Sequence, residues 1–301
     1  MYDIVIIGSG PAGLSSAIYA QRAGLKAVVV EKNYLGTGQI AESERVDNYP
    51  GLYGENGFDL GEKFRSHAES LGTEFIEGEA VKISKNTTDY SIELDNGNSL
   101  ETHTVIYAVG TERRKLHVEG EKEFSGRGVS YCAVCDAAFY KDKITAVAGG
   151  GDTALGDAAL LSKFAKKVYL IHRRDKFRAN KTLQQKVENI SNVEILLNSQ
   201  IKKINGSNKV ESITVDKNGA ETEIKVDGVF VAVGSVPNSA ILKDLVEVDN
   251  NGYIVANEDG VTSANGIFVA GDVRTKKLRQ VVTAVSDGAN CVLSAEDYLE
   301  K

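Results

Sequence analysis

Long apolar segments are missing from this sequence, which contains no stretch of about 18 uncharged apolar residues. Because a helix that spans a bilayer needs a run of roughly that length, we expect no membrane span. The short apolar run at residues 4–7 lacks the basic flank of a secretory signal and is typical of a buried strand. Prolines are also rare, and the three in the chain leave little room for a Pro-rich linker.

Basic residues are not in excess either. Lysine and arginine together number 35 against 42 aspartates and glutamates, which gives a formal net charge of −7. Binding to nucleic acid requires a basic surface that neutralises phosphates, so we expect no nucleic acid partner. A hydrophobic content of 42% and a charged content of 26% are those of a soluble globular protein, and 301 residues suffice for about two domains.

Cysteine is scarce, at three residues, and the pattern of the three is informative. Cys132 and Cys135 form a Cys-x-x-Cys pair, whereas Cys291 stands alone and is interpreted as a small packed hydrophobe. An odd number of cysteines without a secretory signal is typical of a reducing compartment, so we expect a cytoplasmic protein. In that compartment a close pair is more often redox-active or metal-binding than a structural staple.

Two similar units of strand, glycine-rich loop, helix and strand occur in the chain. Their loops lie at residues 8–13 and 149–154, so that the second begins 141 positions after the first. The strands that follow the two helices are expected at residues 27–30 and 168–171. Strands that alternate with helices indicate mostly parallel sheets with crossover helices. The sequence therefore predicts an α/β protein with two dinucleotide-binding, Rossmann-like domains.

The first loop has the spacing Gly-x-Gly-x-x-Gly and consists of Gly8, Ser9, Gly10, Pro11, Ala12 and Gly13. Glycines at this spacing allow a tight turn and close approach of a pyrophosphate, which the free N–H groups of the following helix can bind. Glu31 ends the next strand, where a carboxylate can accept hydrogen bonds from both ribose hydroxyls. An ordinary tight turn is the alternative, but the flanking strand and helix favour a site for a dinucleotide with a free ribose.

The second loop contains Gly149, Gly150, Gly151, Asp152 and Thr153, with Ala154 in place of the third glycine. The residue that matches Glu31 after the same offset is His172, and it is followed by Arg173, Arg174 and Arg178. A carboxylate would repel a 2′-phosphate, whereas guanidinium groups bind it through charge-assisted hydrogen bonds. This loop is therefore expected to prefer NADP(H) to NAD(H). A solvated basic patch is the alternative, which the preceding strand disfavours.

The cysteine pair is best interpreted as a redox dithiol. Zinc needs four ligands, but Cys291 is the only other cysteine, and the four histidines show no paired spacing. A pair of unreactive core cysteines remains an alternative. Asp136 directly follows Cys135, so a proton donor or acceptor stands beside the sulfurs, as disulfide exchange requires. We expect Cys132, Cys135 and Asp136 to be catalytic and to belong to the second nucleotide domain, because the pair lies shortly before Gly149.

Together these motifs resemble those of the low-molecular-weight, bacterial-type thioredoxin reductases over essentially the whole chain. The resemblance rests on residues 8–13, 38–39, 48–51, 132–136, 172–179, 271–273 and 279–280. It implies an FAD-binding domain of residues 1–112 and 241–301, and an NADPH-binding domain of residues 113–240 that is inserted into it and carries the cysteine pair. It also implies a homodimer whose partner is thioredoxin or a thioredoxin-like dithiol protein, with no metal.

The resemblance also implies roles for single residues. Electrons would pass from NADPH through FAD to the disulfide, where Cys135 is the flavin-proximal sulfur, Cys132 attacks thioredoxin and Asp136 is the acid/base. The further FAD-binding residues that it implies are Lys32, Gly38, Gln39, Asn48, Val81, Gly271, Asp272, Arg279, Gln280 and Val281. Asp272 is expected at the ribityl chain, and the residues from Arg279 to Val281 at the pyrimidine edge of the flavin.

The sequence departs from the pattern of that family at four places. Thr37 stands where a glycine usually precedes Gly38, and Glu119 replaces a proline. Residues 156–157, Gly-Asp, replace a pair of glutamates, and residues 137–138, Ala-Ala, stand where glycine and an aromatic are common. The change at 137–138 bears on the surface that would meet the partner protein.

Related flavoproteins differ in their motifs. A glutathione-reductase-like enzyme would have a more widely spaced cysteine pair and a longer C-terminal domain, and reductases that serve ferredoxin lack the pair. Ferredoxin-dependent relatives lack the NADPH loop and its arginines, and peroxide-detoxifying relatives carry an added N-terminal domain. A redox sensor that does not turn over is the alternative from a different class, and Asp136 and the arginines argue against it.

Overall fold

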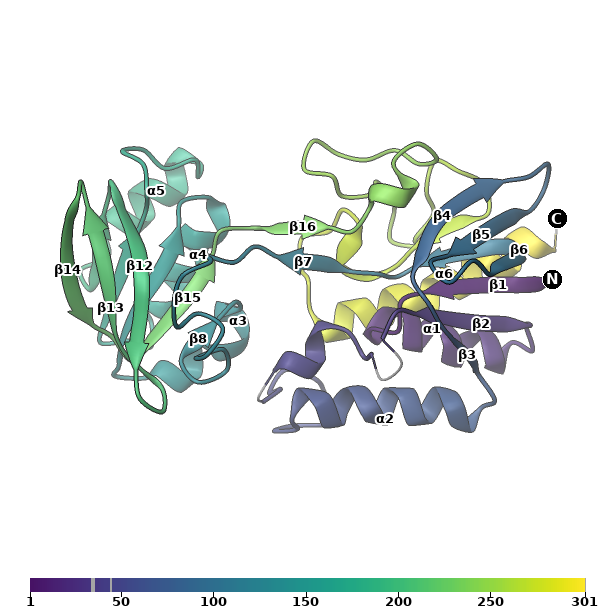
Figure 1. The fold of residues 1–301 in the computed structure, drawn as a ribbon, viewed down its shortest axis with the longest axis horizontal. Helices are drawn as coiled ribbons and strands as arrows, with labels where there is room; N and C mark the ends of the chain where they lie inside the picture. Colours follow the sequence, from purple (N-terminus) through teal and green to yellow (C-terminus); the bar gives the residue numbers. More distant parts are fainter. Residues whose placement is uncertain (34–35, 44, 301) are drawn as a thin grey trace. The chain divides into compact units, whose positions relative to one another are not determined.

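The computed structural model describes residues 1–33, 36–43 and 45–300. Lys301, the last residue of the expected FAD domain, lies outside the described residues, as do residues 34, 35 and 44. The chain forms two compact units, one of Met1–Glu112 with Val236–Lys301 and the other of Arg113–Ser235. Figure 1 shows the first unit in purple, blue and yellow, and the second in teal and green. No helix among the described residues combines the length and the apolar character that crossing a bilayer requires.

A seven-stranded sheet forms the centre of the first unit, with the order β3-β2-β1-β6-β5-β4 and with β17 beside β6. Its strands are β1 (Tyr2–Ile7), β2 (Ala27–Glu31), β3 (Glu74–Glu77), β4 (Ala80–Lys85), β5 (Tyr90–Leu94), β6 (Ser99–Tyr107) and β17 (Ile267–Val269). The pairings of β4 with β5 and of β5 with β6 are antiparallel, and the others are parallel. The helices of this unit are α1 (Pro11–Arg22), α2 (Gly57–Ser70) and α6 (Val281–Leu299).

Both faces of this sheet are covered, which explains the unbroken apolar run of β1. Ile4 and Ile6 pack with α1, α2 and α6 on one face. Val5 and Ile7 pack on the other face with β4, β5 and residues 241–254. All four side chains are buried, as in parallel sheets that have layers on both sides.

The second unit has three layers. Its parallel sheet has the order β11-β10-β9-β15-β8, and a separate antiparallel sheet has the order β12-β13-β14. These strands are β8 (Val129–Ser130), β9 (Ile144–Gly149), β10 (Lys167–Ile171), β11 (Val193–Leu196), β12 (Ser199–Gly206), β13 (Val210–Lys217), β14 (Ala220–Lys225) and β15 (Gly228–Ala232). The helices α3 (Ala133–Asp136), α4 (Asp152–Leu161) and α5 (Lys181–Glu188) complete the unit. The helices cover one face of the parallel sheet, and the antiparallel sheet covers the other.

The chain passes between the units in two short strands, β7 (Thr111–Arg113) and β16 (Ser235–Pro237), which pair with each other. The second crossing falls after Ser235, whereas the sequence analysis placed it after Ala240. Residues 238 and 239 are bonded to the first unit, which accounts for the difference. The Tyr107 hydroxyl donates to the Asn238 carbonyl at 2.6 Å, and the Ser239 hydroxyl donates to the Gly252 carbonyl at 2.6 Å.

Parallel strands end at the same edge of each sheet, and this brings the sequence motifs together. In the first unit, Ile7 at the end of β1 is level with Val30 of β2 and Tyr107 of β6. The first glycine loop and Gly271 follow strands that end at this edge, and Glu31 is the last residue of β2. In the second unit, Ala148 is level with Ile171, so the second glycine loop and His172 also share an edge. Dinucleotides bind at this edge of open α/β sheets. The α/β fold with two dinucleotide-binding units is therefore confirmed.

Candidate functional site

The three glycines of the first loop differ in how much room the fold leaves for a side chain. Gly8 has a φ of +100°, and a Cβ atom there would lie 2.7 Å from the Ala108 carbonyl oxygen. A Cβ atom on Gly13 would lie 1.8 Å from the Gly8 carbonyl oxygen. Gly10 has more room, because the nearest atom to an added Cβ is the Gly38 Cα at 3.8 Å. The fold itself thus requires Gly8 and Gly13 but not Gly10, which stands where a pyrophosphate would come close to the backbone in a dinucleotide-binding loop.

Glu31 lies beside this loop, as the sequence analysis predicted. Its Oε2 atom accepts hydrogen bonds from the backbone N–H and the hydroxyl of Ser9, both at 2.9 Å, and its Oε1 atom accepts from the Asn33 N–H at 3.0 Å. Helix α1 begins at Pro11, and no side chain caps its N-terminus. The first N–H groups of α1 are therefore available to an anion. The Glu31 carboxylate lies at the end of β2, the strand that pairs with β1. The chemistry of the loop fits a dinucleotide with a free ribose.

Thr37 replaces an expected glycine without disturbing the loop that contains Gly38. Its side chain is 2% exposed and lies against helix α2. There Gly61 provides the space, because a Cβ atom on Gly61 would lie 2.4 Å from the Thr37 Oγ1 atom. Gly38 in turn packs on the first glycine loop, since a Cβ atom added to Gly38 would lie 2.9 Å from the Gly10 Cα. A small residue in α2 compensates for the larger residue before Gly38.

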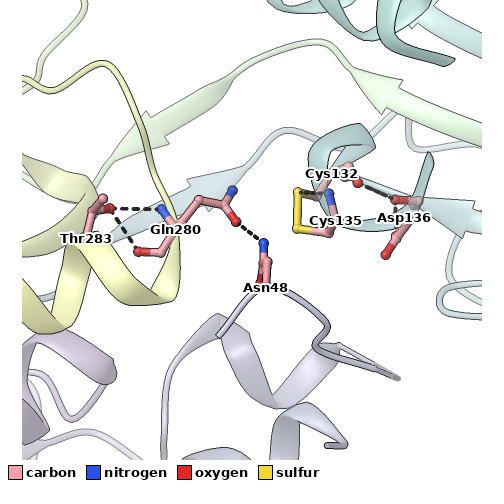
Figure 2. Close-up of a disulfide and its surroundings, with 7 residues drawn as sticks. Asn48, Cys132, Cys135, Asp136, Gln280 and Thr283 are labelled. Carbon is pink, nitrogen blue, oxygen red and sulfur yellow. Dashed lines mark hydrogen bonds between the residues drawn. A yellow bond between two sulfur atoms is a disulfide. The ribbon is translucent and has the colours of Figure 1, made fainter. Parts of the chain in front are cut away.

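Two of the expected flavin-site residues meet across a long sequence separation. Asn48 Nδ2 donates to Gln280 Oε1 at 2.6 Å, as Figure 2 shows. Gln280 also forms a capping box with Thr283 at the start of α6, in which the Gln280 N–H donates to the Thr283 hydroxyl at 3.2 Å. Gln39 lies in the 3₁₀ helix η1 (Gln39–Glu42), and its Nε2 atom donates to the Thr111 carbonyl. These contacts fix three amides within the first unit.

The segment from Gly271 to Val281 joins β17 to α6. Its first residues, including Asp272, form the 3₁₀ helix η4 (Gly271–Val273). Arg279 Nε donates to the Asp272 carbonyl at 3.3 Å, and the Arg279 guanidinium lies 4.1 Å from the centre of the Tyr253 ring. The segment therefore folds back on itself and holds Asp272, Arg279 and Gln280 in one short stretch.

Two further residues of the expected FAD set lie elsewhere in the first unit. Lys32 is exposed just after β2. Val81 lies in β4 at an irregularity of the pairing with β5, and its side chain is 48% exposed. The structure thus places both on the surface, and their assignment to FAD stays a prediction.

In the second glycine loop, too, the fold leaves room for a side chain at one glycine and not at the others. A Cβ atom on Gly149 would lie 2.3 Å from the Ala232 carbonyl oxygen, and one on Gly150 would lie 2.2 Å from the His172 ring. Gly151 has no atom within 4 Å of an added Cβ. Helix α4 begins at the next residue, Asp152, without a side-chain cap. Again the glycine next to the helix is the one that the fold leaves free for a ligand.

His172 supports the loop that carries the arginines. Its ring is 6% exposed, stacks on Phe177 with ring centres 5.3 Å apart, and its Nε2 atom is hydrogen-bonded to the Lys176 carbonyl at 3.0 Å. The Arg178 N–H donates to the Gly150 carbonyl at 2.8 Å, which ties the two loops together. Burial lowers the pKa of His172, the hydrogen bond to the Lys176 carbonyl raises it, and the nearby arginines lower it, so that the net shift of the pKa is downward.

The three arginines supply the positive charge of this loop. Arg173, Arg174 and Arg178 are all exposed, and they follow the end of β10 within seven residues of Ile171. Asp152 is engaged elsewhere, because its Oδ1 atom accepts from the Asn180 backbone N–H at 2.9 Å. Thr153 is exposed in the first turn of α4. The loop therefore presents guanidinium groups and free helix N–H groups, a donor set that fits a phosphorylated dinucleotide.

Cys132 and Cys135 are joined by a disulfide at the start of α3. The Cys135 N–H donates to Cys132 Sγ at 3.2 Å. Ser130, at the end of β8, was not identified from the sequence. Its hydroxyl donates to Asp136 Oδ2 at 2.5 Å and accepts from the Cys132 N–H at 3.1 Å. A serine in a strand gives no sequence signal of its own, so only the structure connects Ser130 to the pair.

The other departures from the family pattern also have structural accounts. Glu119 forms an ion pair with Lys203 at 2.6 Å in the second unit. Gly156 lies in α4 with no atom within 4 Å of an added Cβ. Asp157, on the same helix, is half-buried, and this burial raises its pKa to about 7. Ala137 is buried in the 3₁₀ helix η2 (Ala137–Tyr140).

Comparison with known proteins gives concordant results. The profile of a family described as pyridine nucleotide-disulphide oxidoreductase matches residues 2–288. A thioredoxin reductase from Bacillus subtilis is 42% identical over 304 residues, covering 100% of this chain and 96% of the relative. The crystal structure of thioredoxin reductase from Streptococcus pyogenes has a TM-score of 0.95 and 40% identity, covering 100% of this chain and 98% of its own. Thioredoxin reductase from Giardia duodenalis has a TM-score of 0.94 and 36% identity, covering 100% and 99%.

The two unconstrained glycines provide a test of the loops. Gly10→Ala should weaken FAD binding by at least about tenfold, and Gly151→Ala should weaken NADPH binding by about as much, since each methyl group takes the space that a pyrophosphate needs. Dissociation constants from fluorescence titration of the cofactor-free protein measure both effects. Gly156→Ala is the matched control, because Gly156 has as much room as Gly151 but lies outside the loop. Unchanged affinity for both cofactors in the two loop variants would contradict the assignment.

Proposed function

Because this chain belongs to the pyridine nucleotide-disulphide oxidoreductase family and, within it, to the thioredoxin reductases, we propose that its two loops divide the cofactors between them. The enzyme uses FAD and NADPH and reduces the disulfide of thioredoxin. FAD would bind at the first glycine loop and NADPH at the second. The observation that carries the function is the closed Cys132–Cys135 disulfide with Asp136 beside it, in the unit that carries the arginine loop.

The chain's own residues have distinct tasks toward FAD. When bound, FAD takes up a hydride from NADPH and passes two electrons on. The N–H groups at the start of α1 would bind its pyrophosphate, and Glu31 would accept hydrogen bonds from its ribose. Asp272, Arg279 and Gln280 would bind the flavin portion. The hydrogen bond between Asn48 and Gln280 supports this placement, because it orients the amide of Gln280 before any ligand arrives.

Reduction of the disulfide consumes two electrons and two protons and yields two thiols. Cys132 then loses its proton, and its thiolate attacks one sulfur of the partner's disulfide; the displaced sulfur leaves as a thiolate that takes up a proton. Cys135 loses its proton in turn and attacks Cys132 in the mixed disulfide, which restores the Cys132–Cys135 bond and releases the second partner sulfur as a thiolate that also takes up a proton. The hydrogen bond from the Cys135 N–H to Cys132 Sγ supports Cys132 as the attacking sulfur, because a donor lowers the energy of a thiolate.

Asp136 would supply and remove the protons of these steps. Its Oδ2 atom accepts from the Ser130 hydroxyl at 2.5 Å, and the same hydroxyl accepts from the Cys132 N–H at 3.1 Å. Ser130 therefore fixes the carboxylate relative to the backbone of Cys132. A positioned carboxylate of this kind is what general acid and base catalysis requires.

The surface around the pair suits a protein partner. Val134 lies between the two cysteines and is 58% exposed, and Phe139 follows in η2 and is 40% exposed. Exposed apolar side chains next to reactive groups are typical of contact surfaces. We propose thioredoxin or a thioredoxin-like protein as the partner there. A homodimeric assembly and a cytoplasmic location remain predictions from the family resemblance.

The cysteines provide the direct test of the function. Cys132→Ser and Cys135→Ser should each abolish NADPH-dependent reduction of thioredoxin while leaving FAD bound, because each removes one of the two sulfurs that carry the electrons. Thioredoxin thiols released over time and the flavin absorbance of the purified protein measure the two properties. Cys291→Ala serves as the control and should stay active, since Cys291 is buried outside the pair. Substantial thioredoxin reduction by either serine variant would refute the assigned roles.

The arginines provide a separate test of cofactor preference. Replacing Arg173 and Arg174 by glutamine should weaken NADPH binding far more than NADH binding, because each lost contact to a 2′-phosphate costs about 1.5–3 kcal/mol. The ratio of kcat/KM for the two cofactors measures the preference. A matched control replaces Lys217 and Lys225, two exposed lysines of the antiparallel sheet in the same unit, and removes the same charge. An equal loss for NADPH and NADH in the arginine variant would refute the phosphate site.

A further inference from the structure

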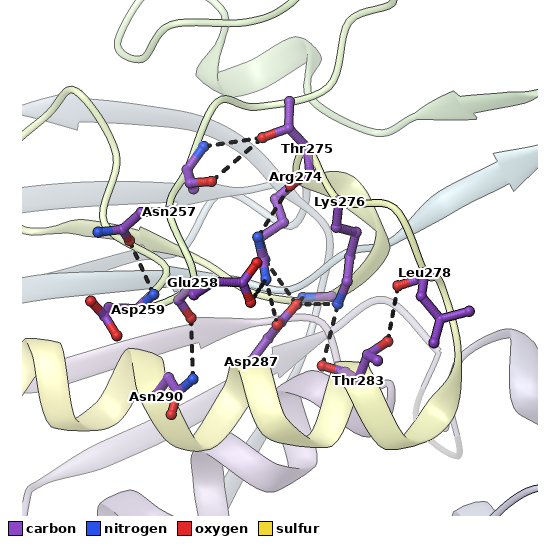
Figure 3. A network of polar contacts seen from close by, with 12 residues as sticks. Asn257, Glu258, Asp259, Arg274, Thr275, Lys276, Leu278, Thr283, Asp287 and Asn290 are labelled. Carbon is purple, nitrogen blue, oxygen red and sulfur yellow. Dashed lines mark hydrogen bonds and ion pairs between the residues drawn. The ribbon is translucent and has the colours of Figure 1, made fainter.

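A buried ion network lies behind the 271–281 segment in the first unit, as Figure 3 shows. Its centre is Asp287 of α6, which is 3% exposed. The Asp287 carboxylate accepts from Arg274 Nε at 3.0 Å, from Arg274 Nη2 at 2.8 Å and from Lys276 Nζ at 2.6 Å. Arg274 is 1% exposed, and the Lys276 side chain is 5% exposed. Two buried cations thus depend on one buried carboxylate.

Glu258 is a second acidic residue beside Arg274, but it contributes little to neutralising the buried cations. Its Oε2 atom lies 3.2 Å from Arg274 Nη2, but its side chain is 89% exposed. Ion pairs of such exposed groups contribute little to stability because water screens them. Lys276 Nζ also donates to the Thr283 carbonyl at 3.3 Å, a group without charge. Asp287 is therefore the group that neutralises both Arg274 and Lys276.

Asp287 also binds the backbone of the segment. Its Oδ2 atom accepts from the Gly271 N–H at 2.9 Å, immediately before Asp272. Arg279 Nη2 donates to the Arg274 carbonyl at 3.3 Å. A shift of Arg274 would therefore also move the guanidinium of Arg279. The segment is thus attached to α6 at both ends, by Asp287 near its start and by the capping box of Gln280 and Thr283 at its end.

Helix α6 is itself fixed on α1 one residue away from Asp287. A Cβ atom on Gly288 would lie 2.1 Å from the Ala12 carbonyl oxygen, so the two helices touch through their backbones. The Ser15 hydroxyl donates to the Val285 carbonyl at 2.7 Å, and the Ser16 hydroxyl donates to the Gly288 carbonyl at 3.1 Å. Asp287 therefore ties the 271–281 segment to the part of α6 that packs on the first turns of α1.

We propose that Asp287, together with Arg274 and Lys276, is a positioning residue for FAD. It holds Gly271 and Asp272, and through Arg274 also Arg279, in the conformation that receives the flavin. This inference rests on the proposed FAD site. A buried ion network is a weak source of stability compared with apolar side chains of similar volume, whereas it fixes geometry through several directed bonds.

The test replaces Asp287 by asparagine and measures FAD affinity. An amide cannot accept from the arginine, the lysine and the Gly271 N–H together, so Asp287→Asn should raise the dissociation constant of FAD at least about tenfold. Fluorescence titration of the cofactor-free protein gives this constant, and NADPH binding by the second unit should stay unchanged. The absorption bands of the FAD that still binds should shift, since the residues around the flavin have moved.

The matched control is Glu69→Gln on α2 of the same unit. Glu69 Oε1 accepts from Arg65 Nε at 2.9 Å, and the Arg65 side chain is 5% exposed. The control therefore also takes a carboxylate from a buried arginine, and its FAD affinity should match that of the unchanged protein. Equal weakening of FAD in the control and in Asp287→Asn would overturn the proposal in favour of a general effect on stability.

Two more variants complete the test. If Asp287→Asn does not fold, Arg274→Met takes its place, because it removes the bonds of Arg274 to Asp287 and leaves that carboxylate paired with Lys276. Weaker FAD binding supports the proposal, and unchanged binding overturns it. Asp272→Ala tests the proposed FAD site separately from the positioning role of Asp287. Normal FAD binding by Asp272→Ala would mean that the proposed FAD site is wrong. Weak binding by Asp272→Ala but normal binding by Asp287→Asn would overturn the positioning role alone.

Discussion

The close approach of neighbouring backbone to a glycine-rich turn, which occurs in both units, is the constraint on which the rest of this structure depends. Each unit ends a central strand in a glycine loop and begins a helix there without a side-chain cap. In each loop the fold accounts for all the glycines except the one beside the helix, Gly10 in one and Gly151 in the other. Because each of these two glycines stands at a helix start without a side-chain cap, the room beside it fits the close approach of a ligand.

The two loops differ in the residues at the end of the next strand, and we infer from this difference that FAD binds at the first loop and NADPH at the second. Glu31 accepts hydrogen bonds beside the first loop, where its negative charge would repel a phosphate. His172 occupies the matching place in the second unit, packed against Gly150, and is followed by exposed arginines. The disulfide lies in the second unit as well, with helix α3 packed against α4. The unit that would bind the phosphorylated donor therefore also carries the electron acceptor.

Much of the fold could be predicted from the sequence. The strands expected at residues 4–7 and 168–171 lie within β1 and β10, because apolar side chains are buried on both faces of a parallel sheet and form unbroken runs. The glycine loops were predictable because their spacing follows from local backbone geometry. The contact between Thr37 and Gly61 and the role of Ser130 were not, since each depends on two elements meeting in space. Arg274, Lys276 and Asp287 resemble ordinary surface charges in the sequence, and only the packing of α6 shows that they are buried.

The central claim is that electrons from NADPH reach the sulfurs of Cys132 and Cys135 in this chain. The most direct measurement is to add NADPH without oxygen to the FAD-loaded protein, alkylate the thiols and weigh the peptide that contains both cysteines. The account predicts two alkyl groups on that peptide after NADPH and none before it. A flavin that is bleached by NADPH while the peptide keeps its disulfide would contradict the account.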